Sequence, residues 1–342
     1  MSQVVDHLAD LTGLRDRDIL DTTLVTVLRD LLRPRAAAIC HVVGEAPNQR
    51  WLVRARLRAG DMAAQSDPAW IDLDAAPLLS DFPDRLECLI QQESIEVAGA
   101  GCHVTYFPLL TDRDIVGVLE IESAAELDAD QLRAASSMLR VYRNVQGLLD
   151  YSERDSLTGL LNRKTFDDSF HKIAGQSTSV AALAGERRDG QVDRHVYLGV
   201  VDVDHFKLVN DKHGHLIGDE VLLLLSRLMR ASFRYCDRLY RFGGEEFVVL
   251  LRCASDEQAT VAFERLRGAT ETYAFPQVGR ITVSVGFARV RPADSPSAAF
   301  ERADKAVYWA KGNGRNRVGN HGALVEQGAI TEEVRGGDVE LF

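Results

Sequence analysis

The chain has 342 residues, of which 46% are hydrophobic, so it has room for two domains with ordinary cores. Its formal net charge of −11 argues against a broad nucleic-acid-binding surface. Five scattered cysteines without metal-ligand spacing, a polar start without a signal-peptide pattern, and no apolar run of membrane-spanning length predict a cytoplasmic protein without a membrane span.

The first 130 residues predict an α+β domain. Apolar residues recur with helical spacing in residues 19–32. Runs of β-formers indicate strands at 36–43 and 51–57 and a hairpin of 102–110 with 115–121. This hairpin, with a helix expected to begin near residue 127, resembles the end of a GAF sensory domain. The resemblance implies a GAF-like α/β sandwich over residues 1–130 that binds an unidentified small molecule; the alternative is a scaffold for dimerisation.

Residues 131–154 predict a helix that connects two domains. Two adjacent apolar stripes with helical spacing run along it. Such a helix can bury one face on its own domain and the other on a partner chain, and its movement would transmit a signal. The first stripe is Met138, Val141, Val145 and Leu148, and the second is Leu132, Ala135, Leu139 and Tyr142.

Two aspartates follow an apolar, β-branched run at 196–203 that predicts a buried strand. Alternation along the strand places Asp202 and Asp204 on one face at its carboxyl end. A carboxylate there is costly unless a cation or hydrogen-bond donors satisfy it. A single aspartate that starts a loop is common, but the pair favours a ligand site.

The segment after this strand carries groups suited to a nucleotide. Lys207 offers a point charge to a phosphate. Asn210 has a donor and an acceptor, and ionised Asp219 is an acceptor only, so together they suit the edge of guanine. Adenine has no ring N–H beside its amino group, so Asp219 favours guanine. The turn around His213 and His215 favours a structural role for these histidines over metal ligation.

Residues 241–247 predict a β-hairpin with acids at its tip. Gly243 and Gly244 can make a two-residue reversal, and Glu245 and Glu246 follow directly. Alone, the motif favours a solvated acidic turn. Together with the strand aspartates, the paired glutamates indicate a place that handles a hard cation or phosphate chemistry.

A late helix carries two cations at its end. Small residues repeat with helical spacing in 303–310, and Gly312 is placed as a C-terminal cap. Lys311 and Arg315 therefore either complement the helix dipole or clamp a triphosphate beside glycine-rich backbone.

In this order the segments resemble the GGDEF family, the diguanylate cyclases. The likeness covers about residues 155–318, with Gly243 to Phe247 as the signature loop. It implies a ferredoxin-like, palm-type cyclase domain over residues 155–319 that joins two GTP molecules into cyclic di-GMP and releases two pyrophosphates. Since one site holds one GTP, it also implies a homodimer. No P-loop is present, and the reaction needs positioning and cations rather than a covalent nucleophile.

The resemblance implies the role of each site residue. Two Mg²⁺ ions, with Mn²⁺ as an alternative, are held by Asp202, the Val203 carbonyl and Glu245. Glu245, with Glu246, helps to activate the attacking 3′-hydroxyl. Guanine is read by Asn210 and Asp219. The phosphate ligands are the backbone N–H groups of His205 and Phe206 and the side chains of Lys207, Lys311 and Arg315.

Arg234 and Asp237 match the family's Arg-x-x-Asp site for inhibition by the product. Arginine suits bidentate contact with phosphate or guanine, and aspartate suits the guanine N–H groups. A helix-end ion pair is the alternative.

The predicted order after residue 155 is that of a ferredoxin-like core. Residues 177–194 indicate a polar insertion, and residues 320–342, glycine-rich and acidic, indicate a loosely ordered tail. The expected elements are a helix, a strand at 196–203, a helix at 216–233, a hairpin at 238–251, a helix at 256–273, a strand at 280–288 and a helix at 297–311.

Three functions are compatible with these motifs. The first is an active diguanylate cyclase controlled by the N-terminal domain. The second is a silent module that binds GTP or cyclic di-GMP as a receptor, and the third is a cyclase with relaxed nucleotide choice. Asp219 argues against the third. The first is favoured over the second because the expected catalytic groups are all present: Asp202, Lys207, Asn210, Glu245 and Glu246.

Overall fold

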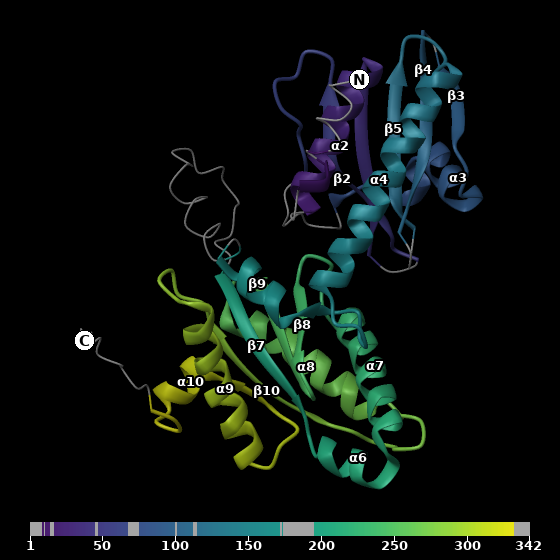
Figure 1. Ribbon diagram of the computed structural model, residues 1–342. Coiled ribbons are helices and arrows are strands. Elements are labelled where there is room, and N and C mark those ends of the chain that lie inside the picture. Colours follow the sequence, from purple (N-terminus) through teal and green to yellow (C-terminus); the bar gives the residue numbers. More distant parts are fainter. Residues whose placement is uncertain are drawn as a thin grey trace. The chain divides into compact units, whose positions relative to one another are not determined.

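The computed structural model describes residues 9, 11–13, 17–44, 47–67, 75–99, 101–111, 115–171, 173 and 195–331. Its contacts divide the chain into two compact units, Met1–Ser152 and Glu153–Phe342 (Figure 1). Three sequence predictions lie wholly or partly outside the described residues: the turn at 111–114, the insertion at 177–194 and the tail beyond residue 331. Within the described part, no helix is both long and apolar enough to cross a bilayer.

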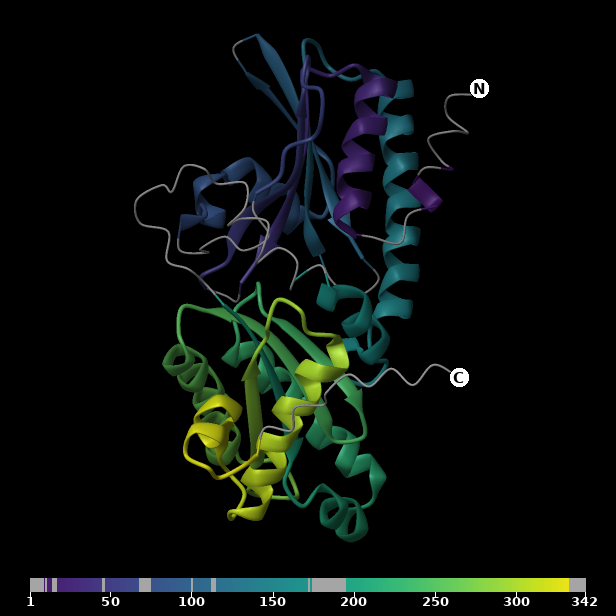
Figure 2. The same ribbon diagram turned by 90° about the vertical axis from the view of Figure 1, so that its left-hand side faces the viewer.

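The first unit is built on an antiparallel five-stranded sheet of order β2-β1-β5-β4-β3. Helices α2 and α4 lie side by side on one face, and α3 covers the other (Figure 2). The predicted strands and hairpin are confirmed. The elements are α2 (Arg17–Leu32), β1 (Ala36–Val43), β2 (Arg50–Arg58), the short 3₁₀ helix η2 (Leu79–Asp81), α3 (Pro83–Gln91), β3 (Ile95–Gly99), β4 (Cys102–Leu110), β5 (Ile115–Ser123) and α4 (Ala129–Glu153).

Helix α4 buries one face in the first unit's core, as its apolar spacing predicted. One stripe of α4 is buried against the sheet and α2, and it combines residues from both predicted stripes. Leu148 and Tyr151 point away from it and are 70% and 88% exposed, which leaves an apolar patch near the end of the helix. The buried stripe is Ala135, Met138, Tyr142, Val145 and Leu149.

A buried polar network fixes α4 on α2. The Tyr142 hydroxyl donates to Asp21 Oδ1 at 2.5 Å, and the Gln146 amide donates to the Tyr142 oxygen at 2.9 Å. Arg17 on α2 then binds Gln146 and Asp150 at 2.5 and 2.8 Å. Because buried polar groups must keep their partners, α4 cannot rotate or slide without breaking these bonds.

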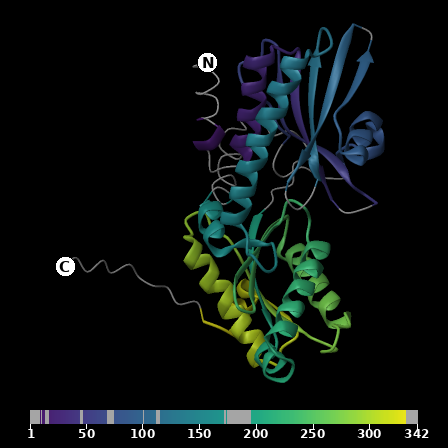
Figure 3. The ribbon, with the colours of Figure 1, turned by 45° about the vertical axis from the view of Figure 1, so that its right-hand side comes forward.

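The second unit contains a six-stranded sheet of order β11-β10-β7-β9-β8-β6. Its four central strands are antiparallel and joined as β-α-β-β-α-β, which is the predicted ferredoxin-like succession. Helices α7 and α8 lie on one face and α9 on the other (Figure 3). The elements are β6 (Leu161–Asn162), β7 (His195–Val203), α6 (Phe206–His213), α7 (His215–Ser232), β8 (Arg238–Gly243), β9 (Glu246–Cys253), α8 (Asp256–Thr272), β10 (Val283–Arg289), α9 (Pro296–Gly312), β11 (Val318–Asn320) and α10 (His321–Glu326).

The helix predicted at 216–233 is confirmed as α7, and a separate helix that was not predicted, α6, precedes it because Gly214 at φ 84° ends α6. The expectation of a loosely ordered tail from residue 320 is wrong at its start, which is ordered. Strand β11 pairs in parallel with β10, and α10 buries His321 and Leu324.

Close packing of α9 on the sheet depends on Gly286 in β10. A Cβ atom there would lie 2.2 Å from the Val307 nitrogen and 2.3 Å from the Ala303 oxygen, both backbone atoms of α9. Since backbone cannot move aside cheaply, we expect Gly286→Ala to lower the free energy of unfolding by about 2 kcal/mol or more. Gly268→Ala in α8, where nothing lies within 4 Å, should instead stabilise by about 0.5–1 kcal/mol. Calorimetric melting temperatures that move the same way for both variants would contradict this packing argument.

Candidate active site

The signature hairpin turns one residue later than predicted. Gly243 pairs with Glu246 across the two strands, so Gly244 and Glu245 form the tip. Gly243 and Gly244 have φ values of 144° and 51°, which lie in the region that favours glycine. Glu245 therefore projects from the turn itself, whereas Glu246 is the first residue of β9.

Strand β7 brings Asp202 beside this hairpin. In the sheet register Asp202 lies opposite Glu246 on β9 and opposite Ser284 on β10. The Val203 N–H donates to the Glu245 carbonyl at 3.4 Å, which ties the tip to the end of β7. The carboxylates expected to hold metal are thus gathered at one corner of the sheet.

Helix α9 adds a cation and a further acid to this corner. Lys311 Nζ lies 2.8 Å from Asp202 Oδ2. Asp304, seven residues earlier on the same helix, adds its negative charge to the fields at Asp202 and Glu246. The sequence prediction missed Asp304, although the seven-residue spacing to Lys311 already places both on one face of a helix.

The electrostatics of this corner favour a bound cation. Burial raises the pKa of Asp202, and Lys311 opposes the rise. Burial and the charge of Asp202 raise the pKa of Glu245, and burial with the charges of Asp304 and Asp202 raises that of Glu246. Ionised carboxylates held this close repel one another, and a cation among them would relieve the repulsion.

The second strand aspartate, Asp204, has a structural role instead. It is 5% exposed and accepts hydrogen bonds from the Thr282 and Ser284 hydroxyls, each at 2.7 Å, and from the Asn316 N–H at 3.0 Å. Its carboxylate is satisfied by donors, which was one of the two explanations open from the sequence. Asp204 therefore joins β7 to β10 and to the loop after α9.

Arg241 connects the tip of the hairpin to Asp155. Arg241 Nη1 lies 3.0 Å from Asp155 Oδ1, and its Nε and Nη2 groups donate to the Gly244 carbonyl at 3.2 and 2.9 Å. Burial alone would raise the pKa of Asp155, but hydrogen bonds from Thr158 and Arg241 bring it below its ordinary value. The conformation of the tip thus depends on Asp155, near the start of the second unit.

The groups expected to contact nucleotide lie at and on α6, on α7, on the last turn of α9 and in the loop after it. His205 precedes α6 in the left-handed conformation, φ 59°, and Phe206 and Lys207 open that helix, whose first N–H groups have no intrahelical acceptor. Asn210 on α6 lies against α7, because a Cβ on Gly218 would be 1.9 Å from Asn210 Oδ1.

Asp219 directly follows Gly218 on α7 and is exposed. The structure therefore brings Asn210 and the Asp219 segment together from adjacent helices. Arg315 lies in the loop after α9 at φ 59°, and its N–H donates to the Ala310 carbonyl at 3.0 Å.

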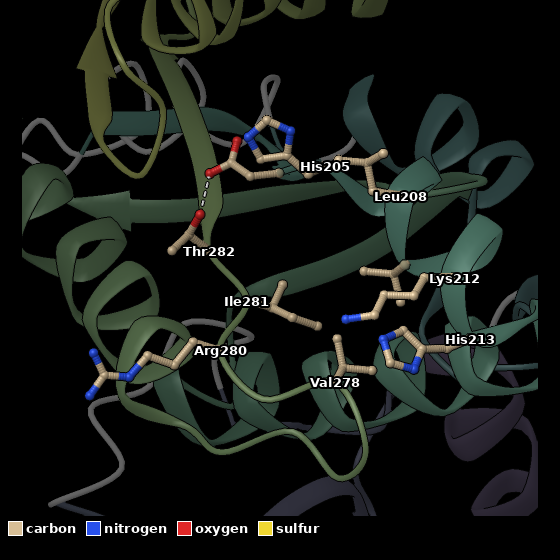
Figure 4. Close-up of a pocket in the computed structure, with 10 residues that line it drawn as sticks. His205, Leu208, Lys212, His213, Val278, Arg280, Ile281 and Thr282 are labelled. Carbon is tan, nitrogen blue, oxygen red and sulfur yellow. Dashed lines mark hydrogen bonds between the residues drawn. The ribbon is translucent and has the colours of Figure 1, made fainter.

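A hollow of about 230 Å³ opens beside α6 (Figure 4). Lys212 and His213 line it from α6, with His205 just before that helix, and Ile281 and Thr282 line it from the segment before β10. Of the predicted site residues it contains only His205. The hollow is therefore distinct from the corner that gathers the carboxylates.

Arg234 and Asp237 form a tight turn before β8. The Arg234 N–H donates to Asp237 Oδ2 at 2.8 Å, and the Asp237 N–H donates to the Arg234 carbonyl at 2.9 Å. Burial raises the pKa of Asp237 to about 6, against the charges of Arg234 and Arg265. The Arg234 side chain is exposed.

The donor set fits a hard divalent cation. Carboxylate and carbonyl oxygens are the ligands that Mg²⁺ prefers. Within the described residues, no three His, Cys, Asp or Glu side chains are arranged as a metal site by themselves. The predicted set has only two such side chains, Asp202 and Glu245, with one backbone carbonyl, so substrate oxygens and water would complete the coordination.

Comparison with known proteins assigns the second unit to a family. Residues 152–317 match the family described as "Diguanylate cyclase, GGDEF domain", so this part of the chain is a GGDEF domain. The match begins at residue 152, and the GAF-like interpretation of the first unit stays a prediction.

Two curated relatives and one solved structure illustrate the similarity. Diguanylate cyclase DgcP of Pseudomonas aeruginosa is 40% identical over 167 residues, which are 48% of this chain and 23% of that protein. Diguanylate cyclase A of Treponema denticola is 38% identical over 248 residues, or 69% of this chain and 64% of that protein. The crystal structure of the GGDEF domain of DgcB from Caulobacter crescentus in complex with c-di-GMP is 30% identical, with a TM-score of 0.45, and the match covers 50% of this chain and 96% of that one. The chain spans less than two thirds of either curated relative.

Proposed function

We propose that this chain is a diguanylate cyclase that joins two GTP molecules into cyclic di-GMP and releases two pyrophosphates. The observation that carries the proposal is the corner formed by Asp202, Glu245 and Glu246 with Lys311, within a GGDEF domain. A receptor that only binds nucleotide would not need this set of close carboxylates, whose mutual repulsion destabilises the unliganded fold.

Asp202, the Val203 carbonyl and Glu245 would hold Mg²⁺, or Mn²⁺, which neutralises charge on the phosphate oxygens when bound. Lys311 and Arg315 at the end of α9 and Lys207 on α6 would position the triphosphate, together with the N–H groups of His205 and Phe206.

Guanine is proposed to bind between α6 and α7. The Asp219 carboxylate would accept hydrogen bonds from the amino and ring N–H groups of guanine, and the Asn210 amide has a donor for its carbonyl group and a further acceptor. Gly218 leaves room for the Asn210 amide. Since Asp219 is an acceptor when ionised, it disfavours adenine.

A glutamate at the hairpin would take the proton of the attacking 3′-hydroxyl. A carboxylate with a raised pKa is a better base near neutral pH, and both Glu245 and Glu246 meet this condition. Glu245 projects from the tip and Glu246 lies against Asp202, so we assign proton transfer to a carboxylate oxygen of one of these two residues.

Two copies must face each other, because one site holds one GTP and the ring needs two. The exposed Leu148 and Tyr151 at the end of α4 would contribute to the contact between copies. A ligand in the first unit would regulate turnover by changing the position of α4, which the hydrogen bonds of Tyr142 to Asp21 and Gln146 hold in place.

Separate incubations of the purified protein with Mg²⁺ and GTP, or with Mg²⁺ and ATP, test this function once products are resolved by chromatography. Cyclic di-GMP from GTP alone is the expected result. Cyclic products from ATP would show relaxed nucleotide choice. Binding of GTP or cyclic di-GMP without turnover would support the receptor alternative and contradict the enzyme.

Product inhibition is proposed at Arg234 and Asp237. The exposed guanidinium of Arg234 is free to form a bidentate contact with cyclic di-GMP, and Arg234→Ala should raise the product concentration that halves turnover by roughly tenfold or more. Arg227→Ala, an exposed arginine on α7, is the matched control and should leave inhibition unchanged. Equal inhibition of the Arg234 variant and the wild type, measured with added cyclic di-GMP, would reject the site.

A further inference from the structure

Lys311 contacts a carboxylate that the proposed function gives to a metal ion. We propose that Lys311 is a resident counter-ion of Asp202, which opposes metal binding until GTP draws the ammonium group away to its phosphates. This inference rests on the proposed function and deepens it, because it makes metal binding and nucleotide binding depend on each other.

The contact is direct and partly shielded from solvent. Lys311 Nζ lies 2.8 Å from Asp202 Oδ2, and the two side chains are 36% and 14% exposed. The ammonium also lowers the pKa of Glu245, Glu246 and Asp304 against the rise caused by burial. Lys311 thus offsets repulsion among several acids at once.

A divalent ion and an ammonium group compete for the same oxygen of Asp202. Held side by side they would repel, and the repulsion is greater in this half-buried corner than in water. Lys311 stands on the last turn of α9, and its long side chain can leave Asp202 while the helix stays in place. A triphosphate beside the carboxylates offers it a second anionic partner.

Coupling between the two ligands follows from this exchange. GTP that takes Lys311 exposes Asp202 to the metal, and metal on Asp202 releases Lys311 to the phosphates. By linkage, each ligand raises the affinity for the other by the same factor. The metal site is then weak in the free enzyme and strong in the loaded one.

The test is Mn²⁺ binding to the full chain without nucleotide at pH 8, with free Mn²⁺ measured by electron paramagnetic resonance. Lys311→Met removes the competing charge and should tighten Mn²⁺ binding roughly three- to tenfold, since an ion pair of this exposure contributes a factor of this order. Lys311→Arg should bind Mn²⁺ about as the wild type does. Lys305→Met is the matched control: its ammonium lies on the same helix, 3.6 Å from Glu301, and Mn²⁺ affinity should not change.

Unchanged or weaker Mn²⁺ binding by Lys311→Met would overturn the inference, because a purely structural lysine would at most disturb the site when removed. Asp202→Asn should abolish the tight component in either background. A melting temperature for each variant checks that it is folded. If Lys311→Met does not fold, Lys311→Arg keeps the test decisive, because it retains the positive charge and should bind Mn²⁺ as the wild type does. If the wild type makes no cyclic di-GMP but Lys311→Met binds Mn²⁺ more tightly, the proposed function is wrong and the counter-ion role of Lys311 is supported. If the wild type makes cyclic di-GMP but Lys311→Met does not bind Mn²⁺ more tightly, the counter-ion role is wrong and the proposed function is supported.

Discussion

Glu245→Gln should reduce the rate of cyclic di-GMP formation by roughly a hundred- to a thousandfold or more. Glutamine keeps the size of the side chain but removes the charge that the proposed metal site and proton transfer require. Glu245 stands at the tip of the hairpin, and the Val203 N–H holds its carbonyl at 3.4 Å, so the substitution should not move the backbone. The measurement is chromatography of product formed from GTP and Mg²⁺ at saturating concentrations.

The melting temperature of Glu245→Gln distinguishes a loss of catalysis from a loss of folding. The raised pKa of Glu245 means that its ionised form is less favourable in the folded protein than in the unfolded chain. A carboxyl of this kind contributes stability at low pH and loses it as pH rises through the folded pKa. At neutral pH, Glu245→Gln should therefore melt at the same or a higher temperature than the wild type. Glu326→Gln in α10 is the control for activity, and a lower melting temperature with lost activity for Glu245→Gln would attribute the defect to folding.

Asp204→Ala should lower the free energy of unfolding of the second unit far more than Asp202→Asn does. The variant leaves three donors without their acceptor: the Thr282 and Ser284 hydroxyls and the Asn316 N–H. A stranded buried donor costs about 1–3 kcal/mol. The Ser284 hydroxyl is buried and the other two donors are partly buried, so we expect a loss of about 2–3 kcal/mol. Differential scanning calorimetry of the whole chain can follow the transition of this unit.

Asp202→Asn is the matched variant two residues away. Burial disfavours the charge of Asp202 and the ion pair with Lys311 favours it, so the two effects of removing the charge largely offset each other. The melting temperature should therefore be nearly unchanged while turnover is lost. Asp204→Asn keeps the volume and one acceptor oxygen, and its melting temperature should fall between those of Asp204→Ala and the wild type. Equal melting temperatures for Asp204→Ala and Asp202→Asn would show that the buried hydrogen bonds of Asp204 contribute little.

The pair Asp202 and Asp204 shows where prediction from the sequence ends. The apolar, β-branched run correctly predicts the strand, with both carboxylates at its carboxyl end. It cannot tell which carboxylate meets donors from β10, because Thr282 and Ser284 lie about 80 residues further along the chain. The same holds for Lys311 and Asp202, whose contact joins the end of α9 to β7.

Missed elements have equally specific causes. The edge strand β3 is short and mostly exposed, so it lacks a strong apolar pattern. Strand β11 has only three residues, and its parallel pairing with β10 depends on a partner outside its own segment. Helix α6 has only eight residues, and Gly214 separates it from the longer apolar pattern of α7, so it gives no helical pattern of its own.

Local sequence by itself determined the longer strands, most of the amphipathic helices, the glycine hairpin and the chemical types gathered around it, since these depend on residues that are near neighbours in the chain. Tertiary structure alone decided that Asp202 meets Lys311, that Asp204 is enclosed by hydroxyls, and that residues from both apolar stripes of α4 share one buried face. The physical reason is that charge, burial and hydrogen bonding act between atoms a few ångströms apart in space, and the chain order sets that proximity only after the sheet has formed.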